Sequence, residues 1–457
     1  MALQKVMEID MENKIEKKTD KNTDKKKKSK NAIGKINPIL YHVVHAVLRP
    51  FYTLKYKIHF DRKIVKDIKG PAIVVATHTS NSDHILSALT LYPVRPTYIV
   101  SEHFMRNPST AGLLKHMHVI TKKMFTADVS TIINILRAKK ENAVIVIFAE
   151  GRLSCFGRTL PVAEGTAELI KKLGVDLYAW KAEGAYLTFP KWMNKGGDRI
   201  GRINASVKRL LTAEEVSERS IDEIKAITEA AIYNDDELAM ADVEYKAKDM
   251  TIGVDKILYK CPVCLKEDTI TAGENHIRCE CGLDATLDSK YILHNAPFRR
   301  INDWFAWQQD SIDTETEHLE SKARLGTPGE DGFMDPNAGE GEIYIDKDEF
   351  RLSGTLHGEP IEFTVKTDKI GAFPIAPGDH FDIYHGGKLI YVYTQPDLKA
   401  SVKWVCYLDK LNADRKMKAL GAVAAKEENM QTSVEENIEE TVSEKTVEAH
   451  DAFAENA

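Results

Sequence analysis

The chain has 457 residues, of which 43% are hydrophobic and 29% are charged, and its formal net charge is −6. This length and this balance predict two to four globular domains and exclude a fibrous or wholly disordered protein. A membrane span needs roughly 20 uninterrupted apolar residues; the nearest candidate, residues 38–54, is interrupted by histidine, arginine and proline. The opening residues contain no apolar core, so we expect no signal peptide and a cytoplasmic protein with reduced thiols.

The two ends of the chain differ in charge. Residues 1–31 contain a run of lysines, whereas residues 416–457 are dominated by glutamate. Both compositions predict disordered segments, a basic arm and an acidic tail. A basic arm is attracted to anionic surfaces such as lipid headgroups, although acidic residues dilute the charge along most of this one.

Residues 32–250 alternate short, β-branched apolar runs with helical patterns, which predicts a mixed α/β sheet flanked by helices. The expected strands lie at residues 72–77, 97–100, 143–148 and 175–180. The expected helices lie at residues 84–91, 111–117, 128–138, 163–173 and 217–231. This pattern places the boundary of the first domain near residue 250.

The residue composition changes after residue 250. Residues 251–292 carry a group of cysteines, and residues 293–415 are expected to form a linker and a β-rich module. Within the latter, residues 321–341 are rich in Gly, Pro, Asp and Glu, which predicts a linker or a mobile loop. Short aromatic runs between residues 342 and 394, separated by turn signals, predict the all-β module.

A histidine and an aspartate five residues apart follow the first expected strand. His78 and Asp83 lie where a strand ends and a helix begins, so the turn can bring the carboxylate beside the imidazole. Such a pair is a competent general base for an alcohol. A structural interpretation stays open, because Ser80 and Asp83 have the spacing of a helix-capping pair and His78 suits a hydrogen-bonded core position.

A second polar block follows the strand at residues 143–148. Glu150 offers a hydrogen-bond acceptor for a glycerol hydroxyl, and Arg152 offers a forked cation for phosphate, with the flexible Gly151 between them. The alternative is a surface turn with an incidental ion pair. Ligands of open α/β sheets bind at the carboxyl ends of the strands, so both blocks lie where a site is expected.

Together these two blocks resemble the 1-acylglycerol-3-phosphate acyltransferase family, over roughly residues 40–235. The resemblance implies that His78 deprotonates the acceptor hydroxyl, which attacks an acyl thioester, and that Asp83 orients the imidazole. It also implies that Glu150, Gly151, Arg152 and Ser154 hold the acceptor. The thioester donor is expected to be acyl-coenzyme A or acyl carrier protein, and the acceptor a lysophospholipid.

Two departures from the family pattern concern the acceptor. Ala149 stands where the family usually has proline, which removes no functional group. The intermediate block that often supplies an arginine to the phosphate is Val119-Ile-Thr-Lys-Lys here, so Lys122 or Lys123 is expected to substitute as a less specific cation. These changes leave the reaction class unchanged and leave the identity of the acceptor open.

Four cysteines between residues 261 and 281 form the clearest metal-binding pattern. Cys261 and Cys264 are followed by Cys279 and Cys281, and four converging thiolates give the tetrahedral shell that zinc prefers. We therefore predict a structural zinc ribbon, with disulfides as the alternative. His276 is an unnecessary further ligand.

Two wider expectations follow. Acyl substrates partition into membranes, and the segment Ile39 to Tyr56 suits a helix that lies among headgroups, or one that simply packs on the domain. A peripheral association with the cytoplasmic membrane face is therefore expected. The alternative function is a zinc-ribbon adaptor with an inactive, lipid-binding acyltransferase-like domain; nucleic acid is not an expected partner, since the ribbon is acidic on balance.

Overall fold

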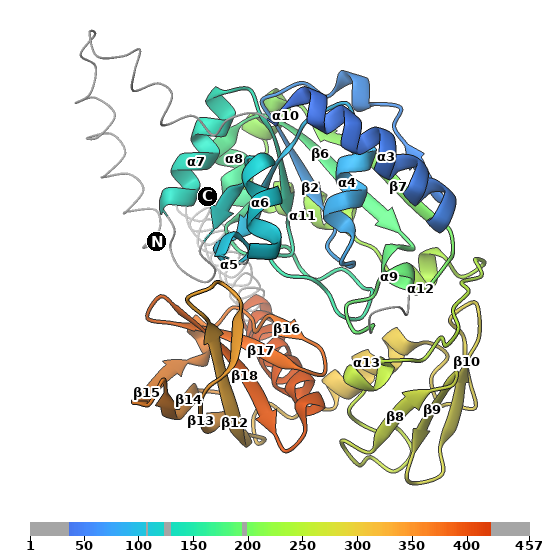
Figure 1. Ribbon diagram of the computed structural model, residues 1–457, viewed down its shortest axis with the longest axis vertical. Helices are drawn as coiled ribbons and strands as arrows, with labels where there is room; N and C mark the ends of the chain where they lie inside the picture. The colour runs from blue at the N-terminus through green and yellow to red at the C-terminus, as the bar shows by residue number, and fades with distance from the viewer. Residues whose placement is uncertain (1–35, 107, 123–128, 194–198, 422–457) are drawn as a thin grey trace, which may run out of the picture.

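The computed structural model describes residues 36–106, 108–122, 129–193 and 199–421. In Figure 1 an α/β domain lies above two smaller parts, an antiparallel β module at the lower left and a cysteine-bearing ribbon at the lower right. Helix α13 (Ile301–Asp310) lies between these two parts.

The first domain is built on a seven-stranded sheet in the order β1-β7-β6-β2-β5-β3-β4. Strands β2, β5, β3 and β4 are mutually parallel, β6 is parallel to β2, and β7 is antiparallel to β6. The strands are β1 Ile58–Asp61, β2 Ala72–Ala76, β3 Thr97–Ser101, β4 Ile120–Lys122, β5 Val144–Phe148, β6 Asp176–Glu183 and β7 Ile203–Leu211. The predicted mixed α/β fold class is confirmed.

Helices cover both faces of this sheet, and the central strand β2, which is apolar at each position, is therefore buried on both sides. Val74 and Ala76 pack with residues of α3 and α4, whereas Ile73 and Val75 pack with residues of α7, α8 and α11. The helices of the domain are α3 Pro38–Tyr56, α4 Asp83–Leu91, α5 Glu102–Arg106, α6 Pro108–His116, α7 Val129–Lys140, α8 Thr166–Leu173, α9 Ala185–Thr188, α10 Ala213–Glu218, α11 Ile221–Ile232 and α12 Asp236–Ala239.

Three helix predictions need correction at their ends. The helix expected at residues 111–117 spans Pro108–His116. The helix expected from residue 163 begins at Thr166, because Gly165 has a positive φ of 80° and ends the preceding turn. The single helix expected at residues 217–231 is two helices, α10 and α11. Ser220 accepts a hydrogen bond from the backbone of Glu223 and caps a new helix there.

The cysteine-bearing ribbon is a four-stranded antiparallel sheet in the order β11-β10-β9-β8. Its strands are β8 Ile270–Gly273, β9 His276–Cys279, β10 Asp284–Leu287 and β11 Leu293–His294. The side chains of Ile270, Ile277 and Ala285 belong to a core that also contains Tyr186 and Trp192 of the first domain. The ribbon is therefore continuous with that domain.

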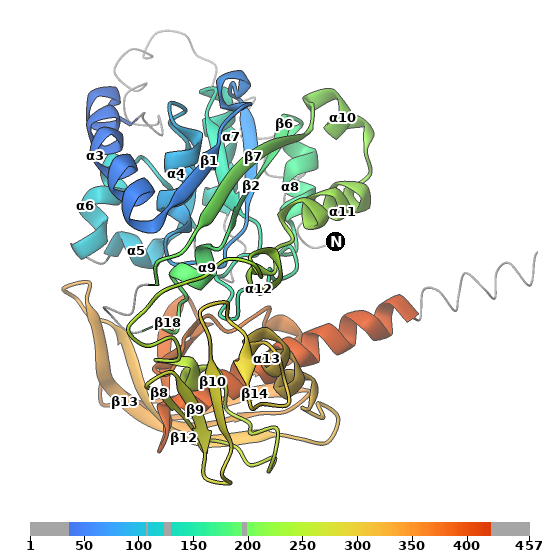
Figure 2. The same ribbon diagram turned by 90° about the vertical axis from the view of Figure 1, so that its right-hand side faces the viewer.

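The C-terminal module is an antiparallel sheet in the order β15-β14-β13-β12-β18-β17-β16, followed by a helix at residues 401–421. Its strands are β12 Leu319–Pro328, β13 Met334–Ile345, β14 Glu349–Leu356, β15 Glu359–Lys366, β16 Ile375–Ala376, β17 His380–His385 and β18 Lys388–Gln395. Figure 2 shows the helix running along the module and emerging at one side.

The linker predicted at residues 321–341 is wrong. This segment forms most of the hairpin β12–β13, which pairs from Leu319↔Ile345 to Pro328↔Met334. Glycine replaces side chains where strands approach closely: a Cβ at Gly339 would lie 1.9 Å from the carbonyl oxygen of Thr355. The Gly-rich composition thus reflects close strand packing.

Residues 401–421 also depart from prediction, since helix occupies the beginning of the segment expected as a disordered tail. The basic arm and the rest of the acidic tail lie outside the described residues. Among the helices that the structure describes, none combines the length and the apolar character that crossing a membrane requires.

Candidate active site

The two polar blocks lie next to each other at the carboxyl end of the sheet. Strands β2 and β5 are parallel neighbours, with Ala76 paired to Phe148. Beyond them, the backbone N–H of Ser154 donates to the carbonyl oxygen of His78 at 2.8 Å, and the backbone N–H of His78 donates to Glu150 Oε1 at 2.5 Å. The blocks therefore form one hydrogen-bonded unit although they are about seventy residues apart in sequence.

His78 and Asp83 form the pair that their spacing predicts. Nδ1 of His78 lies 3.1 Å from Oδ2 of Asp83, whose side chain is fully buried at the start of α4. The same Oδ2 accepts the backbone N–H of Ser80 at 2.9 Å. The imidazole stacks on Phe148, with ring centroids 4.3 Å apart, and 24% of its side chain is exposed. These contacts fix the ring and leave Nε2 as the nitrogen that can take a proton from a substrate.

Burial and charge act together on the imidazole. Burial, assisted by the cation of Lys191, lowers the pKa of His78 from 6.5 to about 3. His78 is therefore neutral at neutral pH, as a general base must be. Burial raises the pKa of Asp83, and the backbone N–H groups of Ser80 and Thr79 oppose this by bonding the charged form.

Glu150 is engaged by the backbone. Its Oε1 accepts from His78, as above, and its Oε2 accepts the N–H of Leu160 at 2.8 Å. Its side chain is buried, which raises the pKa of the carboxyl to about 8 against the effect of these two bonds. The geometry thus uses Glu150 to join the ends of β2 and β5 and to shape the turn between them.

Gly151 and Ser154 also shape this turn. Gly151 has a φ of +73°, a conformation that favours glycine, and its N–H donates to Phe148. Ser154 is buried, and its Oγ donates to the carbonyl oxygen of Arg158 at 2.6 Å. Their predicted contacts with the acceptor remain predictions.

Arg152 has a partner that its sequence context does not indicate. Its Nη2 forms a hydrogen bond and an ion pair with Asp409 of the C-terminal helix, 257 positions away in sequence. Only 14% of the Arg152 side chain and 20% of the Asp409 side chain are exposed. The cation predicted to bind phosphate is therefore linked to the β module.

Other cations lie at or near this edge of the sheet. Lys122 is the last residue of β4, whose carboxyl end is on the same edge because β4 is parallel to β3, and it is exposed. Lys123 lies outside the described residues. Lys191 was missed by sequence reasoning; it comes two residues after Phe189, whose carbonyl oxygen accepts the N–H of Asn81 at 3.4 Å. A lone lysine after a proline carries no signal that would identify it.

The four cysteines of the ribbon converge as predicted. The sulfurs of Cys261 and Cys281 are 3.8 Å apart and those of Cys264 and Cys279 are 3.7 Å apart, with all four within 4.8 Å of one another. A tetrahedron with zinc–sulfur bonds of about 2.3 Å has edges of about 3.8 Å. The group can therefore hold a zinc ion. All four thiols are free, and His276 Nδ1 is engaged by Asp284 at 2.6 Å.

Comparison with known proteins finds a likeness for part of the first domain. Residues 55–180 match the family model described as Acyltransferase, and this segment contains both polar blocks. No curated protein matches the chain. A similar solved structure is that of the 1-acyl-sn-glycerophosphate (LPA) acyltransferase, PlsC, from Thermotoga maritima, with 18% identity and a TM-score of 0.32. The match covers 38% of this chain and 68% of that one.

Proposed function

Because residues 55–180 match the Acyltransferase family model, we propose that the chain transfers a fatty acyl group from a thioester to a hydroxyl of a lysophospholipid. The observation that carries the proposal is the 3.1 Å contact of His78 and Asp83 beside the turn that bears Arg152. A neutral, oriented imidazole next to a forked cation provides both a base for an alcohol and a ligand for a phosphate.

The chemistry follows from the geometry of His78. Nε2 accepts the proton of the acceptor hydroxyl while the oxygen attacks the thioester carbonyl carbon. The resulting imidazolium is stabilised by Asp83 on Nδ1. When the tetrahedral intermediate collapses, the carbon–sulfur bond breaks and the imidazolium returns the proton to the departing thiolate. The products are an ester and a free thiol, and His78 is neutral again.

The acceptor is held by its phosphate in this proposal. Arg152 supplies a planar, permanently charged donor group, and Lys122 at the end of β4 supplies a second positive charge on the same edge. The acceptor that fits this arrangement is 1-acylglycerol 3-phosphate. Glu150, Gly151 and Ser154 maintain the turn that presents Arg152, and their contact with the acceptor is part of the same proposal.

The test uses the purified full chain, a radiolabelled acyl donor and lysophosphatidic acid. Acyl-coenzyme A and acyl carrier protein thioester are offered separately, because the donor is to be determined. We expect labelled diacyl product with at least one donor and its loss in His78→Ala. Absence of product with both donors, or full turnover in the variant, would contradict the proposal.

The ribbon and the first helix have supporting roles. We assign a structural zinc ion to Cys261, Cys264, Cys279 and Cys281, which would fix the ribbon against the domain.

Helix α3 buries Tyr41, His45 and Tyr56 and leaves its other face exposed. The exposed apolar side chains of this helix are Ile39, Leu40, Val43, Val44, Val47, Phe51 and Leu54. This face suits the headgroup region of a membrane that supplies the lipid substrates, on the cytoplasmic side.

A further inference from the structure

The turn that bears Arg152 is held from outside the first domain. We call residues 150–158 the acceptor loop. Phe156 in this loop stacks on Phe305 of α13, with ring centroids 4.4 Å apart and an angle of 10° between the planes. Arg158 lies 3.8 Å from Asp303 of the same helix. The downstream half of the chain therefore contributes to the shape of the loop.

The contact of Arg152 with Asp409 is the most specific of these. Of the three guanidinium nitrogens of Arg152, only Nη2 has a hydrogen-bond partner among the residues that the structure describes. Asp409 therefore uses one part of a guanidinium that has five N–H donors. A largely buried guanidinium needs a counter-charge when no ligand is present. Asp409 provides this charge and leaves the remaining donors for a second anion.

The helix that carries Asp409 is firmly attached. Cys406 and Tyr407 are buried in a core that also contains Cys155 of the acceptor loop. The hydroxyl of Tyr407 donates to the carbonyl oxygen of Glu317 at 2.8 Å. Because the core spans the two parts, withdrawing the helix would expose apolar surface on both of them.

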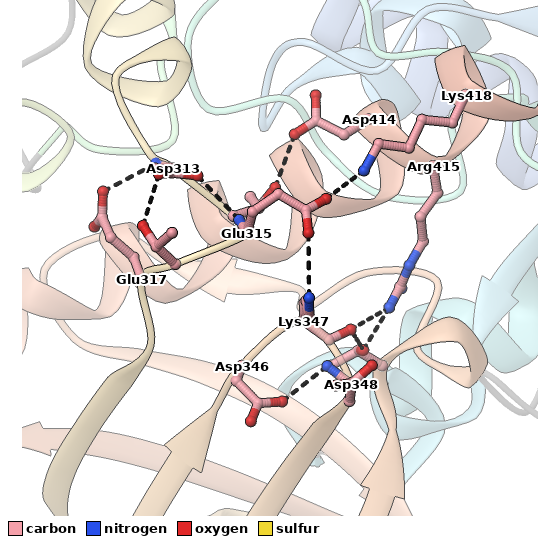
Figure 3. Close-up of polar contacts among 12 residues, drawn as sticks. Asp313, Glu315, Glu317, Asp346, Lys347, Asp348, Asp414, Arg415 and Lys418 are labelled. Atoms are coloured by element: carbon pink, nitrogen blue, oxygen red, sulfur yellow. Dashed lines mark hydrogen bonds and ion pairs between the residues drawn. The ribbon is translucent and has the colours of Figure 1, made fainter. Parts of the chain in front are cut away.

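Polar contacts at the far end of this helix hold it to the module and to the segment that precedes β12 (Figure 3). Nη2 of Arg415 donates to Thr367 Oγ1 at 2.7 Å, and Thr314 Oγ1 donates to Asp414 at 2.9 Å. Lys418 pairs with Glu315. With both ends fixed, the carboxylate of Asp409 has a defined place relative to the acceptor loop.

We propose that Asp409 is a positioning residue, which orients Arg152 so that its free donors meet the phosphate of the acceptor. This rests on the proposed function. By this proposal the C-terminal module completes the acceptor site, and selectivity for a phosphate-bearing acceptor depends on a residue outside the acyltransferase-family domain. The opposite role, in which Asp409 occupies the phosphate position and must be displaced, predicts opposite kinetics.

The experiment compares two acceptors with the full chain, lysophosphatidic acid and the uncharged monoacylglycerol. In Asp409→Asn, we expect KM for lysophosphatidic acid to rise about tenfold because an oriented, charge-assisted contact is lost. We expect kcat to change less than about twofold and the kinetics with monoacylglycerol to stay unchanged. Lys416→Gln, at an exposed position of the same helix, is the control and should behave as the wild type.

A double-mutant cycle isolates the contact. In an Arg152→Ala background, Asp409→Asn should have no further effect on KM, since its partner is already absent. If Asp409→Asn unfolds in a thermal melt, Asp409→Glu serves instead: it keeps the charge, moves it by one methylene, and should raise KM by a smaller factor. An unchanged or lowered KM for lysophosphatidic acid would overturn the positioning role. Failure of the wild type to acylate lysophosphatidic acid would instead overturn the proposed function.

Discussion

Replacing Asp83 by asparagine is the sharpest perturbation of the proposed base. Asparagine has nearly the same size as aspartate, which matters because the Asp83 side chain is fully buried. It removes the charge that faces the imidazolium formed during the reaction. For opposite charges about 4 Å apart at an effective dielectric constant of about 20, the interaction is about 4 kcal/mol. Losing this interaction in the transition state would lower kcat about a thousandfold.

The assay is steady-state acyl transfer with saturating donor and acceptor, together with a thermal melt to confirm the fold. Asp61→Asn is the matched control, because Asp61 is partly exposed and contacts Lys63, whose Nζ lies 3.8 Å away and whose backbone N–H donates to it at 3.3 Å. We expect this control to retain wild-type kcat. If Asp83→Asn keeps more than about a tenth of kcat while folded, the assigned role of Asp83 in charge stabilisation is wrong.

Three further outcomes are expected. Burial and a nearby cation lower the pKa of His78 to about 3, and the base works only when it is neutral, so kcat/KM should fall only well below pH 6.5. An acid limb near pH 6.5 in the pH–rate profile would contradict this. Purified chain should contain about one zinc ion by mass spectrometry, and Cys264→Ser should lose this ion and melt at a lower temperature. Metal retained in that variant, or lost in the control His276→Asn, would argue against the four cysteines as ligands. Leu54→Glu should lower the affinity for anionic vesicles, measured by co-sedimentation, about tenfold or more, because the Leu54 side chain is 81% exposed on α3. The control Leu265→Glu, on the ribbon and 59% exposed, should leave this affinity unchanged, and equal binding by both variants would refute docking by this helix.

Local signals predicted the strands β2, β3, β5 and β6 of the first domain but not β1, β4 and β7. Strand β2 is apolar at each of its five positions and is buried at each of them, so its hydrophobic run identified a central strand. The pairing of His78 with Asp83 followed from their spacing across a strand end. Such features depend on residues that are near one another in sequence, which is why the sequence contains them.

Contacts between distant segments could not be predicted in this way. Nothing near Arg152 indicates that Asp409 will be its partner, since the two meet only when the module docks on the domain. The engagement of both Glu150 oxygens by backbone N–H groups also depends on two strand ends meeting. The hairpin at residues 319–345 was missed because glycines needed for close strand packing have the composition of a linker.

A crystal structure of the full chain with lysophosphatidic acid and no acyl donor would show whether His78 and Arg152 contact the same acceptor molecule. We expect the phosphate to contact the free donors of Arg152 and the acceptor hydroxyl to lie within about 3.2 Å of His78 Nε2. A phosphate bound away from Arg152, or a hydroxyl directed away from the imidazole in an acceptor bound at this edge of the sheet, would contradict this expectation.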